Sequence, residues 1–219
     1  MASAESAESA ESAEDAGSAE PVTGVVLERS FYARDAREVA PELLLKVLVR
    51  DGLAGRIVEV EAYAGSEDPA SHAFRGPTPR NEVMFGPPGH LYVYFTYGMH
   101  FCANAVCGTE GDATAVLLRA VAPLRGQEIM RGRRLAARRD VDLGNGPAKL
   151  CEAFGIGRDA NGADLVTGDR GLVIVDDGVA PPERPATSGR VGIRVAAERP
   201  WRWYVRGDPH VSRARVVQS

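Results

Sequence analysis

Residues 56–63, with the sequence RIVEVEAY, alternate between two kinds of side chain and carry the clearest strand signal in the chain. Successive side chains of a strand point to opposite faces. One face carries three apolar side chains: Val58, Val60 and Ala62. The other carries Ile57, Glu59, Glu61 and Tyr63. We expect the first face to pack into a core and the second to be solvated or to line a cleft.

The segments that follow predict a sheet around this strand. Residues 91–97, LYVYFTY, favour a second strand that ends at Gly98, and residues 113–123 favour a third, which carries Arg119 among aliphatic neighbours. Between the first two lies a stretch, 64–90, rich in Gly, Pro, Ser, Thr and Asn. Loops this long are usually functional, so we expect binding chemistry there.

Three segments favour short helices. They are residues 40–48, with Pro41 in the first turn, residues 126–139, and residues 147–154, which follow a Gly-Asn-Gly turn. The last forty residues alternate short strand patterns with Pro and Gly turns. This order predicts a single α+β domain whose sheet is predominantly antiparallel and is flanked by short helices.

Length and composition set the class of protein. The chain has 219 residues, of which 44% are hydrophobic and 26% charged, so one globular domain is expected rather than a fibre or a disordered chain. Three cysteines show no CxxC spacing, which fits reduced thiols in a cytosolic protein. No segment has the pattern of a membrane span or a secretion signal, so we expect a soluble cytoplasmic protein.

The charge is unevenly distributed. The formal net charge of −4 argues against a nucleic-acid partner, but residues 1–21 repeat Ser-Ala-Glu and contain no Lys or Arg. We predict a disordered acidic tail at 1–21 and a mildly basic domain at 22–219. Its cations are almost all arginines, with Lys46 and Lys149 the only lysines. Guanidinium groups suit phosphate recognition. A genomic base-composition bias would also produce this excess of arginine over lysine.

Two carboxylates and a histidine are candidates for chemistry. Glu59 and Glu61 share a strand face with Tyr63, which suits acid–base catalysis, but alternating Glu residues are also common on half-exposed strands. His72 lies in the long loop and could contact a ligand, or it could be a surface histidine. The four histidines form no metal-binding spacing, so no metal site is expected.

Aromatic residues suggest a stacking surface. Tyr92, Tyr94 and Tyr97 crowd one strand and its turn, and with other rings they could stack on a base, or they could simply pack the sheet. Asn104 and Arg119 lie in apolar strands and need polar partners. Either a functional site or a structural ion pair would satisfy them.

Ordered motifs of this chain resemble the alkyladenine (3-methyladenine) DNA glycosylase family. Besides residues 56–63, they are DPASH (68–72), TPRN (78–81), MF (84–85), LYVY (91–94), YGM (97–99), Asn104, VLLRA (116–120), GPAKLC (146–151) and YVRG (204–207). The resemblance covers nearly all of residues 29–212. It implies a curved antiparallel sheet and a monofunctional enzyme that flips a damaged purine out of duplex DNA and hydrolyses its N-glycosidic bond.

The resemblance also implies roles for single residues. Glu61 matches the catalytic carboxylate that activates water, Arg119 helps to hold water and DNA near it, and Glu59 is a supporting residue. Tyr63, His72 and Tyr94 would sandwich the flipped base, with backbone groups of Ala70 and His72 on its polar edge. Asn104 would crowd the amino group of normal guanine. On the DNA-binding surface, Tyr97 would fill the vacated stack, alongside Met99, Thr78 and Arg80.

The expected substrates are 3-methyladenine, 7-methylguanine, hypoxanthine and ethenoadenine in damaged double-stranded DNA, processed by a monomer without cofactor or metal. In a bacterium such an enzyme would work at the nucleoid. Two alternatives predict different behaviour. A nucleic-acid-binding module without catalysis would bind independently of lesions, and a nucleoside N-ribosyl hydrolase would act on free inosine.

Overall fold

The computed structural model describes residues 23–213, so the predicted acidic tail at 1–21 lies outside the described residues. The strands are β1 (Val25–Val26), β2 (Val47–Arg50), β3 (Leu53–Ala64), β4 (Leu91–Thr96), β5 (His100–Cys107), β6 (Thr114–Arg125), β7 (Leu172–Asp176), β8 (Ala186–Ser188) and β9 (Arg202–Tyr204). The α-helices are α1 (Arg29–Tyr32), α2 (Ala36–Leu43), α3 (Gln127–Arg133) and α4 (Pro147–Phe154). Short 3-10 helices cover Gly65–Glu67, Glu82–Phe85, Asp140–Asp142 and Arg158–Ala160.

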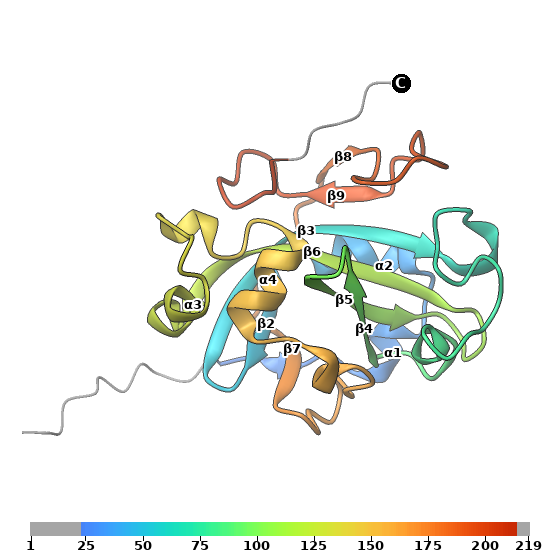
Figure 1. Cartoon of the computed structure of the whole chain (residues 1–219), viewed down its shortest axis with the longest axis horizontal. Helices are drawn as coiled ribbons and strands as arrows, with labels where there is room; N and C mark the ends of the chain where they lie inside the picture. Colours follow the sequence, from blue (N-terminus) through green and yellow to red (C-terminus); the bar gives the residue numbers. More distant parts are fainter. Residues whose placement is uncertain (1–22, 214–219) are drawn as a thin grey trace, which may run out of the picture.

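These strands form one curved sheet in which every described pairing is antiparallel (Figure 1). Its order is β1-β7-β2-β3-β6-β5-β4, and β9 pairs with residues 59–61 of β3 and with β8. The α+β class and the antiparallel sheet with short helices are therefore confirmed. The long central pair, β3 and β6, places the predicted acidic strand in the middle of the molecule.

Helix α2 packs on the sheet through one apolar face. Ala36, Val39, Ala40 and Leu43 recur at helical spacing and are all 0% exposed. Asp35 caps the helix by accepting a hydrogen bond from Arg37 N at 2.7 Å. The predicted helix at 40–48 was misplaced, because Leu44 is extended, Leu45 has a left-handed φ of 65°, and Val47 begins β2. Pairing with β3 and β7 outweighs the local helical signal there.

The pairing of β3 with β6 contains register shifts beside the two carboxylates. Ile57 pairs with Val121, Glu59 with Ala120 and Val60 with Leu118, which leaves Val58 and Arg119 without partners across the ladder. Such bulges switch the face to which the following side chains point. Ile57 therefore lies in the main core with Val60 and Ala62, against prediction. Glu59 and Glu61 are both 0% exposed, so they are buried rather than solvated.

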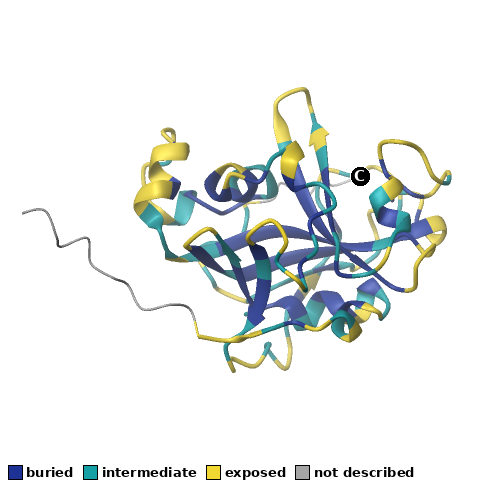
Figure 2. Cartoon of the chain, turned by 90° about the horizontal axis from the view of Figure 1, so that it is seen from below, coloured by how far each residue is buried: buried dark blue, intermediate teal, exposed yellow. Residues whose placement is uncertain are grey.

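The other segments follow the sequence more closely. The strands predicted at 91–97 and 113–123 and the helix at 147–154 are confirmed as β4, β6 and α4. The helix expected at 126–139 is wrong beyond Arg133, where α3 ends. Within α3 only Met130 is buried, and Leu135 just beyond it is 88% exposed, so little apolar packing supports a longer helix. Figure 2 shows the buried central strands and the exposed tip of the β4–β5 hairpin.

Among residues 23–213, no helix combines the length and apolar character that crossing a membrane requires.

Candidate active site

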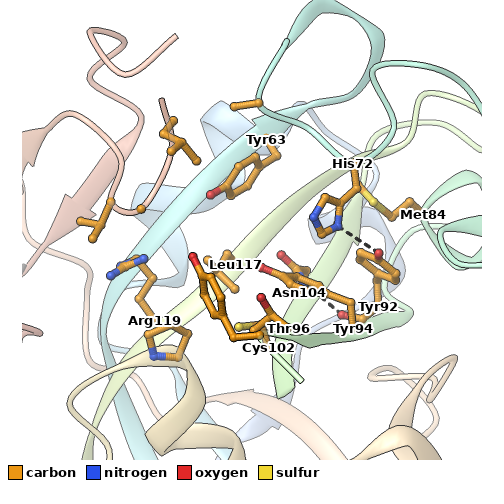
Figure 3. Close-up of a pocket in the computed structure, with 16 residues that line it drawn as sticks. Tyr63, His72, Met84, Tyr92, Tyr94, Thr96, Cys102, Asn104, Leu117 and Arg119 are labelled. Carbon is orange, nitrogen blue, oxygen red and sulfur yellow. Dashed lines mark hydrogen bonds between the residues drawn. The ribbon is translucent and has the colours of Figure 1, made fainter. Parts of the chain in front are cut away.

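A cavity of about 330 Å³ opens between the central sheet, the long loop after β3 and the start of α4 (Figure 3). This volume lies in the range of small-molecule sites. Seven of the predicted site residues line it: Tyr63, Ala70, His72, Tyr94, Tyr97, Asn104 and Arg119. Sequence positions as far apart as the long loop and β6 thus meet at one place.

Aromatic rings from three elements surround the cavity. The His72 and Tyr94 ring centroids are 4.5 Å apart, and Tyr63 lies on the neighbouring strand β3 (Figure 3). His72 Nδ1 is 3.1 Å from the Tyr92 hydroxyl. Burial, with the charge of Arg80, lowers the pKa of His72, and burial raises the pKa of Tyr92 to about 12. At neutral pH the wall therefore presents neutral rings, which suit stacking with a flat base.

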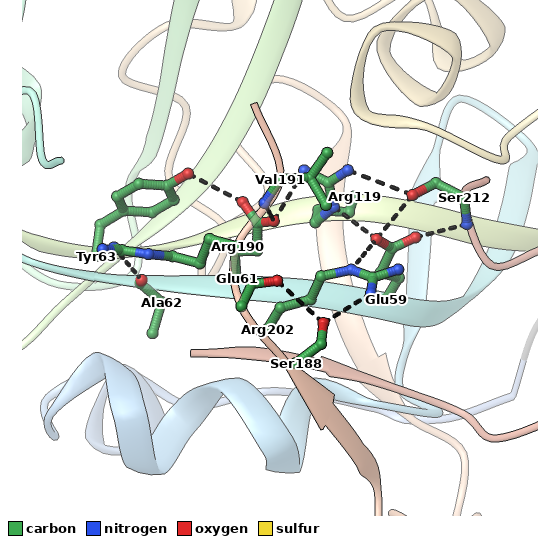
Figure 4. Close-up of polar contacts among 11 residues, drawn as sticks. Glu59, Glu61, Ala62, Tyr63, Arg119, Ser188, Arg190, Val191, Arg202 and Ser212 are labelled. Atoms are coloured by element: carbon green, nitrogen blue, oxygen red, sulfur yellow. Dashed lines mark hydrogen bonds and ion pairs between the residues drawn. The ribbon is translucent and has the colours of Figure 1, made fainter. Parts of the chain in front are cut away.

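Glu61 is not itself among the residues that line the cavity, but its three partners Tyr63, Arg119 and Val191 are, and both of its carboxylate oxygens are engaged (Figure 4). Its Oε1 accepts a hydrogen bond from Val191 N at 2.7 Å, and its Oε2 accepts one from the Tyr63 hydroxyl at 2.9 Å. Burial and the neighbouring Glu61 charge raise the pKa of Tyr63 well above its usual value, so the phenol keeps its proton. Arg119 Nη1 lies 3.1 Å from Glu61 Oε1.

Arg119 bridges the two carboxylates. Its Nε donates to Glu59 Oε1 at 2.6 Å while its Nη1 faces Glu61, and its side chain also lines the cavity. Although burial disfavours its charge, the ion pairs with Glu61 and Glu59 raise the pKa of Arg119. Burial likewise opposes ionisation of Glu59, but the charges of Arg119 and Arg202 outweigh it and lower the pKa of Glu59.

Asn104 and Ala70 line the cavity, and each already donates a hydrogen bond within the protein. Asn104, 4% exposed, donates from Nδ2 to the carbonyl oxygen of Tyr92 at 3.1 Å, and this bond fixes the orientation of its amide. The N–H of Ala70 donates to Asp68 Oδ1 at 3.2 Å. The N–H of Ala70, one of the backbone groups of Ala70 and His72 expected on the polar edge of the base, is therefore already engaged in this structure.

The β4–β5 hairpin brings Tyr97 to the mouth of the cavity. Tyr97 and Gly98 have φ values of 51° and 68°, and Met99 N donates to Thr96 O at 3.2 Å. Two left-handed central residues define a tight turn of the type that hairpins favour. The Tyr97 side chain is 81% exposed, and Met99 on the same tip is 68% exposed.

Three predicted DNA-binding residues lie outside the cavity lining: Thr78, Arg80 and Met99. Arg80 donates to the carbonyl oxygen of Phe95 on β4 at 3.0 Å, which ties the long loop to the hairpin. Thr78 donates to Asn81 from both its N–H and its hydroxyl group. Arg80 therefore holds the long loop beside the hairpin, whereas Thr78 closes a turn within the loop.

Sequence reasoning missed four residues of the site: Arg190, Val191, Arg202 and Ser212. Arg190 forms a buried ion pair with Asp68 and stacks over the Tyr63 ring, 4.7 Å from its centroid. Its neighbour Val191 then meets Glu61 through a backbone N–H. No local pattern could reveal a backbone donor. For Arg190 and Arg202 the sequence shows only that each is a cation near Pro and Gly turns, which could pair with an acidic residue.

Metal-ligand groupings are absent from the described part of the chain, where no three His, Cys, Asp or Glu side chains gather. The three cysteines are buried and unpaired, and one of them, Cys102, lines the cavity.

Comparison with known proteins gives this geometry its context. A family model described as methylpurine-DNA glycosylase (MPG) matches residues 30–209. A protein of Burkholderia cenocepacia named "Putative 3-methyladenine DNA glycosylase" is 57% identical over 198 residues, covering 90% of this chain and 96% of its own length. Proteins of the same name from Streptomyces avermitilis and Methanocella arvoryzae are each 48% identical. They cover 87% and 86% of this chain and 92% and 96% of their own lengths.

These matches define the class of protein as a DNA glycosylase, a hydrolase that cleaves N-glycosyl bonds. The chain belongs to the methylpurine-DNA glycosylase family. Its substrate is damaged DNA, and its activity belongs to DNA repair. A nucleic-acid-binding module without catalysis does not fit this membership.

Proposed function

We propose that this enzyme flips alkylated or deaminated purines out of duplex DNA into the aromatic cavity and hydrolyses their N-glycosidic bond with water activated by Glu61. The observation that carries the proposal is Glu61 itself, a carboxylate that is 0% exposed and lies between the ring of Tyr63 and the guanidinium of Arg119. A buried carboxylate held by three partners beside a cavity is preorganised for chemistry rather than for solubility.

The reaction balances with these groups alone. The C1′–N bond breaks and its electron pair leaves with the base, while the sugar gains oxocarbenium character. A water molecule forms the new C1′–O bond and gives its proton to Glu61. The negative charge of Glu61 also stabilises the sugar cation. Arg119 reaches both the cavity and Glu61, which suits it to hold the water and DNA beside the carboxylate.

We propose 3-methyladenine, 7-methylguanine, hypoxanthine and ethenoadenine as the substrate class. The neutral rings of Tyr63, His72 and Tyr94 suit any flat purine, and the fixed amide of Asn104 would crowd the amino group of normal guanine. The relatives named "Putative 3-methyladenine DNA glycosylase" support the alkylated members. Positively charged alkylated bases leave as neutral molecules, so they need no general acid.

Base flipping depends on the hairpin tip in this proposal. Tyr97 is 81% exposed and also lines the cavity, so it would enter the base stack as the damaged nucleotide leaves it. Met99, Thr78 and Arg80 would contact the DNA around that wedge. Unstacking costs a few kcal/mol, and least at damaged pairs, so the wedge also contributes to lesion selectivity.

We further propose that the enzyme is monofunctional and acts as a monomer in the cytoplasm, at the nucleoid in a bacterial host. Neither lysine of the chain lines the cavity: Lys46 pairs with Asp176 at 2.7 Å, and Lys149 donates to Asn145 at 2.7 Å. No lysine is therefore in place to act as an amine nucleophile for strand cleavage.

Light scattering of the purified chain, alone and with a lesion duplex, tests whether the enzyme acts as a monomer.

The test uses duplexes that carry one hypoxanthine, ethenoadenine or 7-methylguanine, with alkali to convert abasic sites into strand breaks. The wild-type enzyme is expected to release base from the lesion strand only. Glu61→Gln keeps the shape but loses the negative charge, so release is expected to fall by at least about 10³-fold while lesion binding persists. Free inosine and undamaged duplex are the controls. Near-normal release by Glu61→Gln, or cleavage of inosine alone, would contradict the proposal.

A further inference from the structure

We propose that Glu59 is a positioning residue of the hydrolytic reaction, which holds the Arg119 guanidinium and sets how much of its positive charge reaches Glu61. This inference rests on the proposed role of Glu61. Neither carboxylate lines the cavity, but the partners of Glu61 (Tyr63, Arg119 and Val191) all do, whereas of the partners of Glu59 only Arg119 does. The effect of Glu59 would pass through Arg119, which touches both carboxylates.

Glu59 is held by donors from three separate segments (Figure 4). Arg119 Nε on β6 and Arg202 Nε on β9 donate to its Oε1 at 2.6 and 2.7 Å. Ser212 donates from its backbone N to Oε2 at 2.7 Å and from its hydroxyl to Oε1 at 2.8 Å. Glu59 is 0% exposed, so these bonds form away from solvent and fix the carboxylate firmly.

The same contacts fix the orientation of Arg119. A guanidinium group presents its donors in a rigid plane, so binding Nε to Glu59 determines where the other nitrogens point. Nη1 then lies 3.1 Å from Glu61 Oε1, and Nη2 donates to the Ser212 hydroxyl at 3.3 Å. The bulge that leaves Arg119 unpaired in the ladder gives its side chain this position between the carboxylates.

The charges in this cluster are shared unequally. Glu59 has two arginines, Arg119 and Arg202, whereas Glu61 has Arg119 at the longer distance, together with the Tyr63 hydroxyl and Val191 N–H. Further neighbours are Ser188, which accepts from Arg202 Nη1 at 2.9 Å, and Arg190, which stacks on Tyr63. The charge of Glu61 also acts on the Tyr94 phenol and the Cys102 thiol. Removing the Glu59 charge would remove its repulsion of the Glu61 carboxylate and leave Arg119 to pair with Glu61 alone, which stabilises the Glu61 charge. Removing Arg202 would leave Glu59 to pair more strongly with Arg119, which destabilises the Glu61 charge.

The experiment follows single-turnover release of 7-methylguanine from duplex DNA across the acid limb of its pH profile. This base is already cationic, so the limb reports ionisation of the carboxylate rather than protonation of the leaving base. For Glu59→Gln we expect the midpoint to move to lower pH by about one unit, because a like charge has been lost. For Arg202→Gln we expect it to move to higher pH. The exposed Glu110→Gln is the matched control and is expected to leave the midpoint unchanged.

A residue with a purely structural role would lower the rate or the melting temperature without moving the midpoints in opposite directions. Unchanged midpoints in both variants would therefore overturn the inference. If Glu59→Gln fails to fold, the Arg202→Gln profile decides alone, and an unmoved midpoint overturns it. The proposed function fails separately, through an inactive wild type or an active Glu61→Gln. An active wild type that depends on Glu61, with unmoved midpoints, overturns only the role of Glu59.

Discussion

The proposed function rests on two regions, the carboxylate cluster of Glu59 and Glu61 and the tip of the β4–β5 hairpin, and they are built in opposite ways. Glu59 and Glu61 are 0% exposed, and every carboxylate oxygen has a partner. Tyr97, in contrast, is 81% exposed on a two-residue turn. Bond hydrolysis requires charges fixed before the substrate arrives, whereas a wedge requires an apolar ring left free for DNA. Substitutions in the carboxylate cluster should therefore lower both stability and activity, whereas a substitution at the hairpin tip should lower DNA binding without changing stability.

Arg119→Met should show the strongest coupling. The substitution leaves Glu61 and part of Glu59 as buried charges without their shared cation, which costs about 3–5 kcal/mol of unfolding free energy. Base release should be lost as well. Urea unfolding and single-turnover kinetics measure both effects. Exposed Arg138→Met is the control, and loss of activity without loss of stability would show that the two are not coupled in the carboxylate cluster.

Tyr97→Ala should show the separation at the tip. Its ring is largely solvated, so the melting temperature should stay within experimental error of the wild type. Binding to a lesion duplex should weaken by roughly tenfold, because an aromatic stack contributes about 1–3 kcal/mol. Fluorescence anisotropy with lesion duplex and lesion single strand measures the effect. Equal wild-type activity on both forms of DNA would argue against the wedge.

Lowering the pH should destabilise the carboxylate cluster and leave the hairpin tip unaffected. The pKa of Glu59 is lowered in the folded state, so its contribution to stability is complete above the unfolded value of 4.5 and is lost as pH falls through the folded value. The unfolding free energy should therefore decline below about pH 4.5, with a shallower slope in Glu59→Gln. Denaturant melts at several acid pH values test this, and parallel slopes would remove the stabilising role of Glu59.

Deletion of residues 2–20 should have the smallest effect on either region. The sequence of this segment offers no side chain able to bury more than a methyl group, so the melting temperature should not change. Its six carboxylates could still screen nonspecific DNA contacts, which would appear as a changed salt dependence of binding to undamaged duplex. A marked fall in melting temperature would show that the segment packs against the domain.

Local sequence rules succeeded where a segment pairs or packs as its own pattern dictates. β4, β6 and α4 follow from aromatic and aliphatic runs and from Pro147 at a helix start. The same rules failed at residues 40–48, where the second half of the predicted helix forms a strand that pairs with two others. They also failed at Ile57, whose side chain lies on the opposite face from the one predicted because of a bulge. The candidate site was found mainly because the ordered motifs resemble one family.

Local patterns were enough to predict the strand that carries the two glutamates, the aromatic inventory and the antiparallel class, and the ordered motifs indicated the family. The bridge that Arg119 forms between Glu59 and Glu61, and the donors 130 and 153 residues away that complete the two carboxylates, are visible only in the folded chain. Periodicity indicates which face a side chain occupies, whereas its partners depend on bulges and strand register. These are set by the packing of the whole sheet.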